Sequence, residues 1–190
     1  MEKYRLSELS DTQLAIQVQA GATEAFGLLV ARYEGKLLRY GRRFLFDTED
    51  ITDIVQDVFL ASYRHIQTYD PGRPFSPWLY RIAHNRFANE LRRRGRRPLL
   101  FVDFDTFLPH LVAQETADGG TLLAEDREAV ERVLSTLDPK YREPVILYYF
   151  EDMDYEDIAE VLHIPVSTVG VRLKRARQKL KAALSDKAAN

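Results

Sequence analysis

The sequence predicts an all-α protein made of two small helical domains, an N-terminal helical bundle and a C-terminal helix-turn-helix domain, joined by an extended acidic linker. Apolar residues recur at helical spacing along almost the whole chain. Clusters of proline and glycine interrupt this pattern and mark loops. Residues 96–122 show no clear period and separate the two helical parts. We therefore expect domains over residues 1–97 and 123–184, with a linker over 98–122 and a tail over 185–190.

Capping and turn residues predict where the helices begin and end. Ser10 and Gln13 have the spacing of a capping box, which predicts the start of the first helix. Residues 68–77, TYDPGRPFSP, contain three prolines and a glycine and predict a loop. Ser76 and Pro77 suit the N-cap and the first position of the helix that follows. The predicted helices span approximately residues 11–20, 23–46, 48–67, 77–95, 123–136, 139–151, 155–162 and 166–184.

The composition excludes several classes of function. The 190 residues contain no cysteine, which excludes disulfide bonds, thiol catalysis and cysteine-based zinc sites. The N-terminus has no long apolar run, and no stretch is long and apolar enough to span a membrane, so we expect a cytoplasmic protein. The four histidines are scattered without ligand spacing, and the sequence has no glycine-rich phosphate-binding loop. We therefore expect no catalytic residue, no metal site and no cofactor.

Charge is unevenly distributed along the chain, although the net charge is only −2. Residues 81–97 carry seven arginines against one glutamate, and residues 172–181 form a second basic block. Residues 98–122, between the two blocks, contain acidic residues but no lysine or arginine. Two basic segments on either side of an acidic connector predict two separate contacts with nucleic acid. The apolar run at 99–108 could form a strand, but the chain offers no second strand, which favours an extended segment that lies on a partner or in a groove.

Residues 155–181, YEDIAEVLHIPVSTVGVRLKRARQKLK, have the layout of a helix-turn-helix, whose second helix enters the major groove of DNA. Pro165 cannot continue the first helix but can begin the second. His163 stands where glycine often makes the turn, and histidine tolerates positive φ better than most residues. The basic run of the second helix would neutralise phosphates, although Gly170 weakens that helix. The alternative is an ordinary helical hairpin with a solvated basic face.

The predicted helix at 77–95 has an apolar face and an opposite polar face. The polar face contains Arg81, Asn85, Asn89 and Arg92. Asparagine amides and arginine guanidinium groups can bind base edges or phosphates. Aromatic residues lie close by in the sequence and could stack unpaired bases: Tyr69, Phe75 and Trp78. The alternative is that these rings belong to the core, and we favour a core position for Trp78.

The predicted helix at 48–67 presents an outward stripe rich in carboxylates. The stripe consists of Asp50, Asp53, Gln56, Asp57 and Leu60. Because carboxylates repel DNA, this face is expected to meet a basic protein surface, with a plain solvated face as the alternative. A third interpretation is an isoprenoid-type enzyme in which Asp50, Asp53 and Asp57 hold magnesium for diphosphate chemistry. That enzyme would need a second cluster on a facing helix, for which the nominal candidates are Asp152, Asp154 and Asp157.

Three segments together resemble bacterial RNA polymerase sigma factors of the extracytoplasmic-function (ECF) type. DITDIVQDVFLASYRHI resembles the polymerase-binding helix of that family, and FSPWLYRIAHNRFANELRRRGRR resembles its promoter −10 helix. LDPKYREPVILYYFEDMDYEDIAEVLHIPVSTVGVRLKRARQKL resembles its −35-binding domain. The resemblance implies a promoter-specificity subunit that binds core RNA polymerase, recognises the −35 and −10 elements, helps to open the promoter and has no catalysis of its own. It also implies that an anti-sigma factor holds the protein inactive.

The resemblance further implies roles for individual residues. The clamp of the largest polymerase subunit would be bound by Asp50, Asp53, Gln56, Asp57 and Phe59. The −10 element would be contacted by Tyr69, Arg73, Phe75, Asn85, Asn89, Arg92 and Arg93, with the loop from residue 69 to 75 capturing a flipped base. The −35 element would be contacted by Ser167, Thr168, Val171, Arg172, Arg175, Arg177 and Lys179. Gly170 and Val171 depart from the family pattern, which leaves the −35 sequence preference open.

A stand-alone helix-turn-helix regulator, which binds operators without polymerase, is the main competing interpretation. The two basic modules differ from each other, whereas a dimeric repressor binds a palindrome through two identical modules. A regulator that binds only DNA would also not need the acidic stripe at 48–67, which is suited to contact with a basic protein surface. Both observations favour the sigma-factor interpretation.

Overall fold

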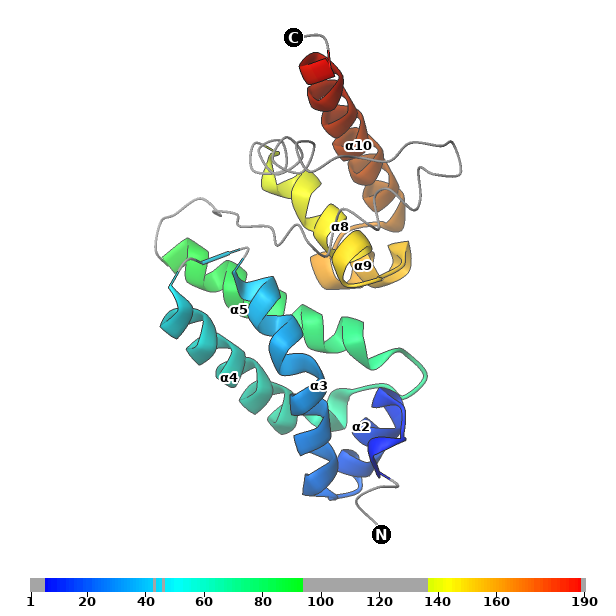
Figure 1. Ribbon diagram of the computed structural model, residues 1–190. Coiled ribbons are helices and arrows are strands. Elements are labelled where there is room, and N and C mark those ends of the chain that lie inside the picture. Colours follow the sequence, from blue (N-terminus) through cyan, green and yellow to red (C-terminus); the bar gives the residue numbers. More distant parts are fainter. Residues whose placement is uncertain (1–5, 43, 46, 94–136, 189–190) are drawn as a thin grey trace. The chain divides into compact units, whose positions relative to one another are not determined.

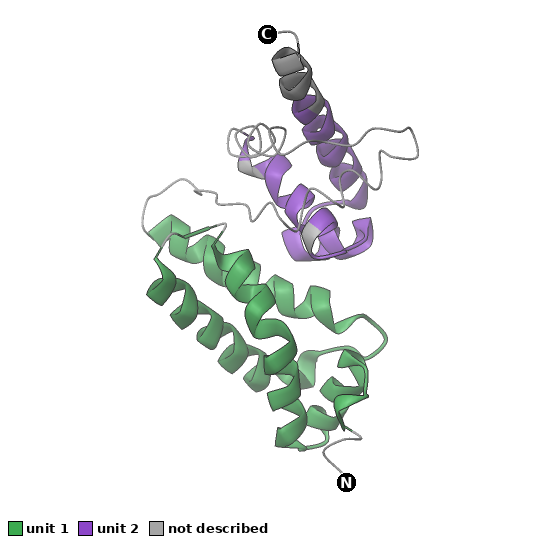
Figure 2. Ribbon diagram, in the orientation of Figure 1, with its two compact units in different colours: residues 1–98 green, residues 99–190 purple. Residues whose placement is uncertain are grey.

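The computed structural model describes residues 6–42, 44–45, 47–93 and 137–188, and the contacts divide the chain into two compact units, residues 1–98 and 99–190 (Figure 2). The described residues form helices and turns and include no β-strand. The predicted all-α class, with two helical domains, is therefore confirmed. The predicted linker and the predicted helix at 123–136 lie outside the described residues.

Unit 1 is a helical bundle. Its long helices α3 (Thr23–Gly41), α4 (Thr48–His65) and α5 (Phe75–Arg93) pack together, as Figure 1 shows. The shorter α2 (Asp11–Gln19) packs against α3 and also contacts α5. One 3-10 turn, η1 (Ile66–Thr68), follows α4 and contacts α2.

Side-chain caps fix the starts of two of these helices. The hydroxyl of Ser10 accepts a hydrogen bond from the backbone N–H of Gln13 at 3.2 Å, and the Gln13 side-chain oxygen accepts one from the N–H of Ser10 at 2.9 Å. The predicted capping box is thus formed. Asp47 caps α4 by accepting a hydrogen bond from the N–H of Glu49 at 2.8 Å.

Aromatic rings fill the core of unit 1. Tyr40 of α3 meets Tyr80 of α5 edge to face, with ring centroids 5.2 Å apart, and its centroid lies 6.1 Å from that of Phe87. The ring of Phe44 stacks on Phe87 at 5.4 Å. Trp78 is buried, as predicted. The geometry of α5 is therefore set by rings packed along one side, which leaves its polar side outward.

Two helix boundaries in unit 1 differ from those predicted. Helix α3 ends at Gly41, five residues earlier than predicted, because the chain turns there and places the ring of Phe44 in the core. Helix α5 begins at Phe75, two residues earlier than predicted. Pro77 then lies in the first turn, where a backbone N–H has no acceptor within the helix and a proline is tolerated.

Unit 2 consists, in its described part, of α8 (Pro139–Phe150), α9 (Tyr155–Leu162) and α10 (Val166–Ala188), which contact one another. Helix α10 runs four residues past its predicted end at 184. The core of the unit is aliphatic and draws on all three helices: Val145, Leu147, Ile158, Val161, Val169, Leu173 and Ala176.

Candidate nucleic-acid and polymerase interfaces

The turn between α9 and α10 is fixed by backbone geometry. His163 adopts the left-handed conformation, with φ 52° and ψ 47°, which confirms the prediction that histidine replaces glycine at this turn. The N–H of Ile164 donates to the carbonyl of Ala159 at 3.1 Å and closes the turn. At the other end of α9, the carboxylate of Asp154 caps the helix by accepting from the N–H of Asp157 at 2.8 Å. These contacts fix the start of α9 and the turn that joins it to α10.

Helix α10 has one buried face and one exposed face. The buried face consists of Val169, Leu173, Ala176 and Leu180. The exposed face contains Ser167, Val171, Lys174, Arg175, Arg177 and Lys179. Val171 is 50% exposed. Thr168 and Arg172 are half-buried on one flank of this face. Lys174 was not among the predicted contact residues, although it is exposed on the same face of α10 as Val171 and Arg175.

Two arginines of α10 bond to tyrosines of the neighbouring helices. The guanidinium of Arg175 donates to the hydroxyl of Tyr141 in α8 at 3.2 Å, and this bond lowers the pKa of that tyrosine. Arg177 donates to the hydroxyl of Tyr155 in α9 at 3.3 Å. The Tyr155 ring also faces Gly170, where an added Cβ would lie 3.5 Å from Cε2 of the ring. An alanine would therefore fit at Gly170, so packing within the unit does not require glycine there.

Acidic and basic groups of α8 surround the half-buried Arg172. Burial raises the pKa of Glu143 to about 7, even though the charges of Arg142 and Arg172 act in the opposite direction. Burial also lowers the pKa of Arg142 to about 10. A hydrogen bond from the backbone N–H of Lys140 lowers the pKa of Asp138, and the charge of Arg172 lowers it further. The charge of Arg172 therefore acts on two carboxyl groups, those of Glu143 in α8 and of Asp138 at its N-cap.

The polar side of α5 forms a second exposed surface, in unit 1. Asn85, Asn89 and Arg92 are exposed on this side, as predicted. The Nε of Arg92 donates to the carbonyl of Ala88 at 3.3 Å, and Arg93 makes two bonds to the Glu90 carboxylate at 2.7 and 2.8 Å. Amide and guanidinium groups, which are able to contact bases and phosphates, thus lie along α5 on the side opposite its aromatic core.

The loop before α5 differs from the prediction in its aromatic residues. Tyr69 is 3% exposed and Phe75 is 2% exposed, and their ring centroids lie 5.4 Å apart. Each ring also packs on Trp78, at 5.6 and 5.5 Å. Neither ring can stack on a base while it is buried in this way, because its faces are covered by protein. The exposed residues of the loop are instead Asp70, Pro71, Gly72, Arg73 and Pro74.

The acidic stripe on α4 is largely outward, as predicted. Asp53, Gln56 and Asp57 are exposed and Asp50 is half-buried. Phe59, which was expected on the same surface, is buried instead and meets Phe26 of α3 edge to face at 6.4 Å. The apolar residues that extend the stripe are Leu60, which is 55% exposed, and Tyr63. Leu60 was expected there, whereas Tyr63 was missed.

Metal binding by the carboxylates of α4 gains no support from the geometry. Among the described residues, no three His, Asp or Glu side chains are grouped so that they could hold a metal ion. The second carboxylate cluster invoked for magnesium chemistry includes Asp154, whose side chain is engaged as the cap of α9. Asp152 adopts a positive φ of 50° at the turn before α9. These residues shape the helix-turn-helix motif, so we do not retain the magnesium interpretation.

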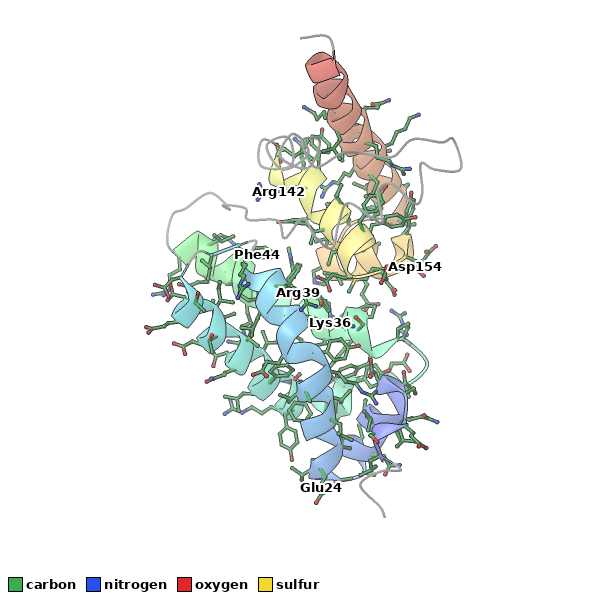
Figure 3. The ribbon with its side chains drawn as sticks, in the orientation of Figure 1. Glu24, Lys36, Arg39, Phe44, Arg142 and Asp154 are labelled. Atoms are coloured by element: carbon green, nitrogen blue, oxygen red, sulfur yellow. The ribbon has the colours of Figure 1, made fainter. Side chains whose placement is uncertain are left out.

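Two basic residues on α3 were not singled out from the sequence. Lys36 and Arg39 are exposed and three positions apart, which places them on one side of the helix (Figure 3). The ammonium of Lys36 lies 5.2 Å from the centroid of the Tyr33 ring. The three-residue spacing of these two cations could have been recognised in the sequence. It was overlooked because the two cations lie outside the arginine-rich segment at 81–97.

Comparisons with known proteins match both units. Residues 29–97 match the family described as Sigma-70 region 2, and residues 127–180 match the family described as Sigma-70, region 4. The RNA polymerase sigma-H factor of Pseudomonas aeruginosa is 36% identical in an alignment of length 189 that covers 94% of this chain and 96% of that protein. The ECF RNA polymerase sigma-E factor of Haemophilus influenzae is 36% identical, with 90% and 93% covered.

Solved structures give the same result for the fold. The structure of CnrH in complex with the cytosolic domain of CnrY matches with a TM-score of 0.67 and 32% identity, and covers 93% of this chain and 97% of that one. The sigma factor RpoE from Bartonella quintana matches with a TM-score of 0.62 at 21% identity, with 84% and 96% covered. No helix among the described residues is long and apolar enough to cross a membrane.

Proposed function

This chain belongs to the ECF sigma factors, and from that membership we propose how a promoter-recognising subunit of RNA polymerase divides its work between its two units. Unit 1 binds core polymerase through α4 and the −10 element through α5. Unit 2 binds the −35 element through α10. The protein has no catalysis of its own, and it acts in the cytoplasm, where polymerase and promoter DNA are found.

The docking surface for polymerase is the outward side of α4. It combines the carboxylates of Asp53 and Asp57 with the exposed apolar side chains of Leu60 and Tyr63. Charge sets orientation and association rate, whereas apolar area supplies most of the affinity at such an interface. A basic surface with an apolar centre, on the clamp of the largest polymerase subunit, is the partner that fits. Phe59 supports this surface from below by packing on α3.

The −10 contacts combine α5 with the loop Tyr69–Phe75, which we name the capture loop. Asn85 and Asn89 offer amide groups to base edges, and Arg92 offers a guanidinium to phosphates or bases. Extruding a base loses stacking worth a few kcal/mol, which new contacts must offset. The capture loop contributes its exposed residues, Arg73 among them, whereas the buried rings hold its shape.

The −35 contacts lie on the exposed face of α10. Ser167 and Arg175 supply polar groups, and Arg177 and Lys179 supply charge for phosphates. Val171 projects an apolar side chain from the same face, which suits contact with the methyl group of thymine.

A regulatory protein is a further partner. The solved CnrH structure has the cytosolic domain of CnrY bound to it, and CnrH is 32% identical to this chain. By analogy, we expect an anti-sigma factor to bind this protein and keep it from polymerase.

The single observation that carries the proposal is that one chain presents an acidic and apolar face on α4, an exposed face of asparagine and arginine side chains on α5, and an exposed basic face on α10. The test is run-off transcription by core RNA polymerase on a library of promoter-like DNA, with and without the protein. Transcripts that depend on the protein and share a two-element motif would support the proposal. Absence of transcripts, with specific binding of duplex DNA by the protein alone, would indicate a stand-alone regulator.

Two variants assign the faces in the same assay. Reversal of Asp53 and Asp57 to lysine is expected to abolish association with polymerase and to leave folding intact, because both side chains are exposed. Arg172→Ala is expected to weaken binding to the upstream element by about 1–3 kcal/mol if this arginine reads a base. Retained polymerase association in the first variant would rule out α4 as the docking surface.

A further inference from the structure

Helix α2 makes its long-range hydrogen bonds to two places in unit 1. It lies before residue 29, where the match to the family described as Sigma-70 region 2 begins. One set of bonds runs from α2 to α3, and the other runs to η1 and the capture loop. The second set joins residues that are about fifty positions apart in the sequence, so it is a tertiary connection.

The last residue of α2 binds the segment just before the capture loop. The side-chain amide of Gln19 donates one hydrogen bond to the carbonyl of Ile66 at 2.8 Å and another to the carbonyl of Tyr69 at 2.9 Å. Both protons of the amide are therefore used. In return, the side chain of Gln67 donates to the backbone carbonyl of Gln19 at 3.0 Å. Side chains at the end of α2 and in η1 thus donate hydrogen bonds to each other's backbone carbonyls.

The first turn of α2 reaches into the capture loop itself. The hydroxyl of Tyr69 donates to the carbonyl of Arg73 at 2.6 Å and is also hydrogen-bonded to the hydroxyl of Thr12, at 3.1 Å. Thr12 and Gln19 are seven residues apart, so they lie on the same side of the helix and about 10 Å apart along its axis. One side of α2 therefore holds the loop at two separated points.

Helix α2 is itself firmly attached to the bundle. The carboxylate of Asp11 lies 2.6 Å from the guanidinium of Arg32 and accepts a hydrogen bond from the hydroxyl of Tyr33 at 2.6 Å. Burial, followed by this bond to Asp11, raises the pKa of Tyr33. Leu14 and Ala15 are completely buried beneath the helix. A loop attached to α2 is thereby attached to α3.

The held loop presents a formed turn to solvent. The N–H of Arg73 donates to the carbonyl of Asp70 at 3.1 Å, and the N–H of Gly72 donates to the Asp70 carboxylate at 2.9 Å. A ligand that binds a loop already in this shape does not have to offset the entropy of ordering it. The hydrogen bonds from α2 can therefore strengthen binding at the exposed residues of the capture loop, although α2 itself does not contact the ligand.

We propose that α2 pre-orders the capture loop, and that Thr12 and Gln19 are positioning residues for capture of the −10 strand. This inference rests on the proposed function, because it takes the capture loop as a contact for that strand. Thr12 acts through the Tyr69 hydroxyl, and Gln19 acts through the carbonyls of Ile66 and Tyr69. Neither residue needs to touch DNA.

The test uses the complete protein assembled with core polymerase. The probe is a single-stranded oligonucleotide that carries the −10 sequence found by run-off transcription. Thr12→Val and Gln19→Leu are each expected to weaken binding of this probe about threefold to tenfold, the effect of losing one or two ordinary hydrogen bonds. Affinity for core polymerase and for the duplex upstream element is expected to stay unchanged.

Matched controls separate positioning from loss of fold. Gln17→Leu makes the same chemical change on an exposed position of α2 and is expected to bind like the wild type. Thr12→Ser keeps a hydroxyl and is expected to restore binding. Amide hydrogen exchange is expected to accelerate at Tyr69 and Arg73 in the two test variants, while the interior amides of α5 keep their protection.

The possible outcomes distinguish this inference from the function on which it rests. If the wild-type holoenzyme binds the −10 strand and Thr12→Val and Gln19→Leu bind it equally well, the positioning role is refuted and the proposed function stands. If the wild-type holoenzyme shows no preference for the −10 strand, the assignment of the loop fails and the inference fails with it. Weaker binding accompanied by faster exchange throughout α5 would indicate general unfolding and would also refute the inference.

Discussion

Gly41, the last residue of α3, provides a sharp test of how closely the helices of unit 1 pack. A Cβ added there would lie 2.5 Å from Cζ and 2.8 Å from Cε1 of Phe87, and 2.7 Å from Cγ2 of Ile51. All three distances are far below van der Waals contact. Phe87 is completely buried and stacked on Phe44, so its ring cannot move aside without disturbing the core. Glycine is needed here because α4 and α5 approach the backbone of α3.

The expected effect of Gly41→Ala follows from two opposing contributions. Forcing a methyl group into a filled core destabilises a protein by about 1–3 kcal/mol. The gain in helix propensity from glycine to alanine is about 1 kcal/mol within a helix and less at its end, where Gly41 stands. We therefore expect a net loss of about 1–2 kcal/mol in the free energy of unfolding.

Two other glycines of α3 supply matched controls. An added Cβ at Gly27 meets nothing within 4 Å, and at Gly35 it meets only the end of the Arg39 side chain at 3.6 Å. Both substitutions to alanine are expected to stabilise unit 1 by about 0.5–1 kcal/mol, because alanine favours the helix. The same chemical change in one helix thus takes opposite signs according to what surrounds it.

Urea unfolding followed by tryptophan fluorescence measures this effect in unit 1 alone. The protein has one tryptophan, Trp78, which is buried in unit 1. Gly41→Ala should shift the midpoint to lower urea without changing the slope of the transition. Combining Gly41→Ala with Phe87→Leu should cost less than the sum of the two separate losses, because the shorter side chain relieves the contact. A Gly41→Ala variant as stable as Gly27→Ala would show that the helices do not pack as described.

The remaining predictions concern unit 2. Glu143, with its pKa raised from 4.5 to about 7, contributes stability that is complete below about pH 4.5 and is lost as the pH rises through 7. Glu143→Gln should remove this loss, stabilising unit 2 at pH 8 by at most about 3 kcal/mol and flattening the pH dependence of hydrogen exchange in α8. His163→Gly should stabilise the turn by about 0.5–1 kcal/mol, since relief of the left-handed conformation exceeds the added chain entropy. Slower exchange of the α9 amides would record that gain, and faster exchange would contradict it.

The features that could be predicted from the sequence are those that depend on neighbouring residues. Ser10 and Gln13 form a capping box because residues three apart meet at a helix start. His163 takes the left-handed turn because Pro165 prevents the first helix from continuing. The outward positions of Asn85 and Asn89 follow from helical periodicity on α5. Each of these required only a short window of the chain.

The features that could not be predicted depend on partners far away in the sequence. Phe59 of α4 was expected on the polymerase-binding surface, whereas it is buried and meets Phe26 of α3 edge to face. Phe26 belongs to another helix, so the pattern within α4 does not show that the Phe59 ring is covered. Tyr69 was likewise expected to contact the −10 element, whereas the structure buries its ring. Its hydroxyl is hydrogen-bonded to Thr12, which lies 57 residues earlier in the chain.

The buried position of Tyr69 and Phe75 changes how aromatic residues beside a basic helix should be interpreted. An exposed ring could stack on a base, but it would also leave the loop free to adopt many conformations, and binding would then have to order it. A buried ring gives up stacking and instead fixes the backbone that carries Asp70 and Arg73. The sequence contains the same aromatic residues in either case. The two designs differ in whether other rings are available to cover these two, and in this chain Trp78 packs on both while Tyr33 of α3 packs on Phe75.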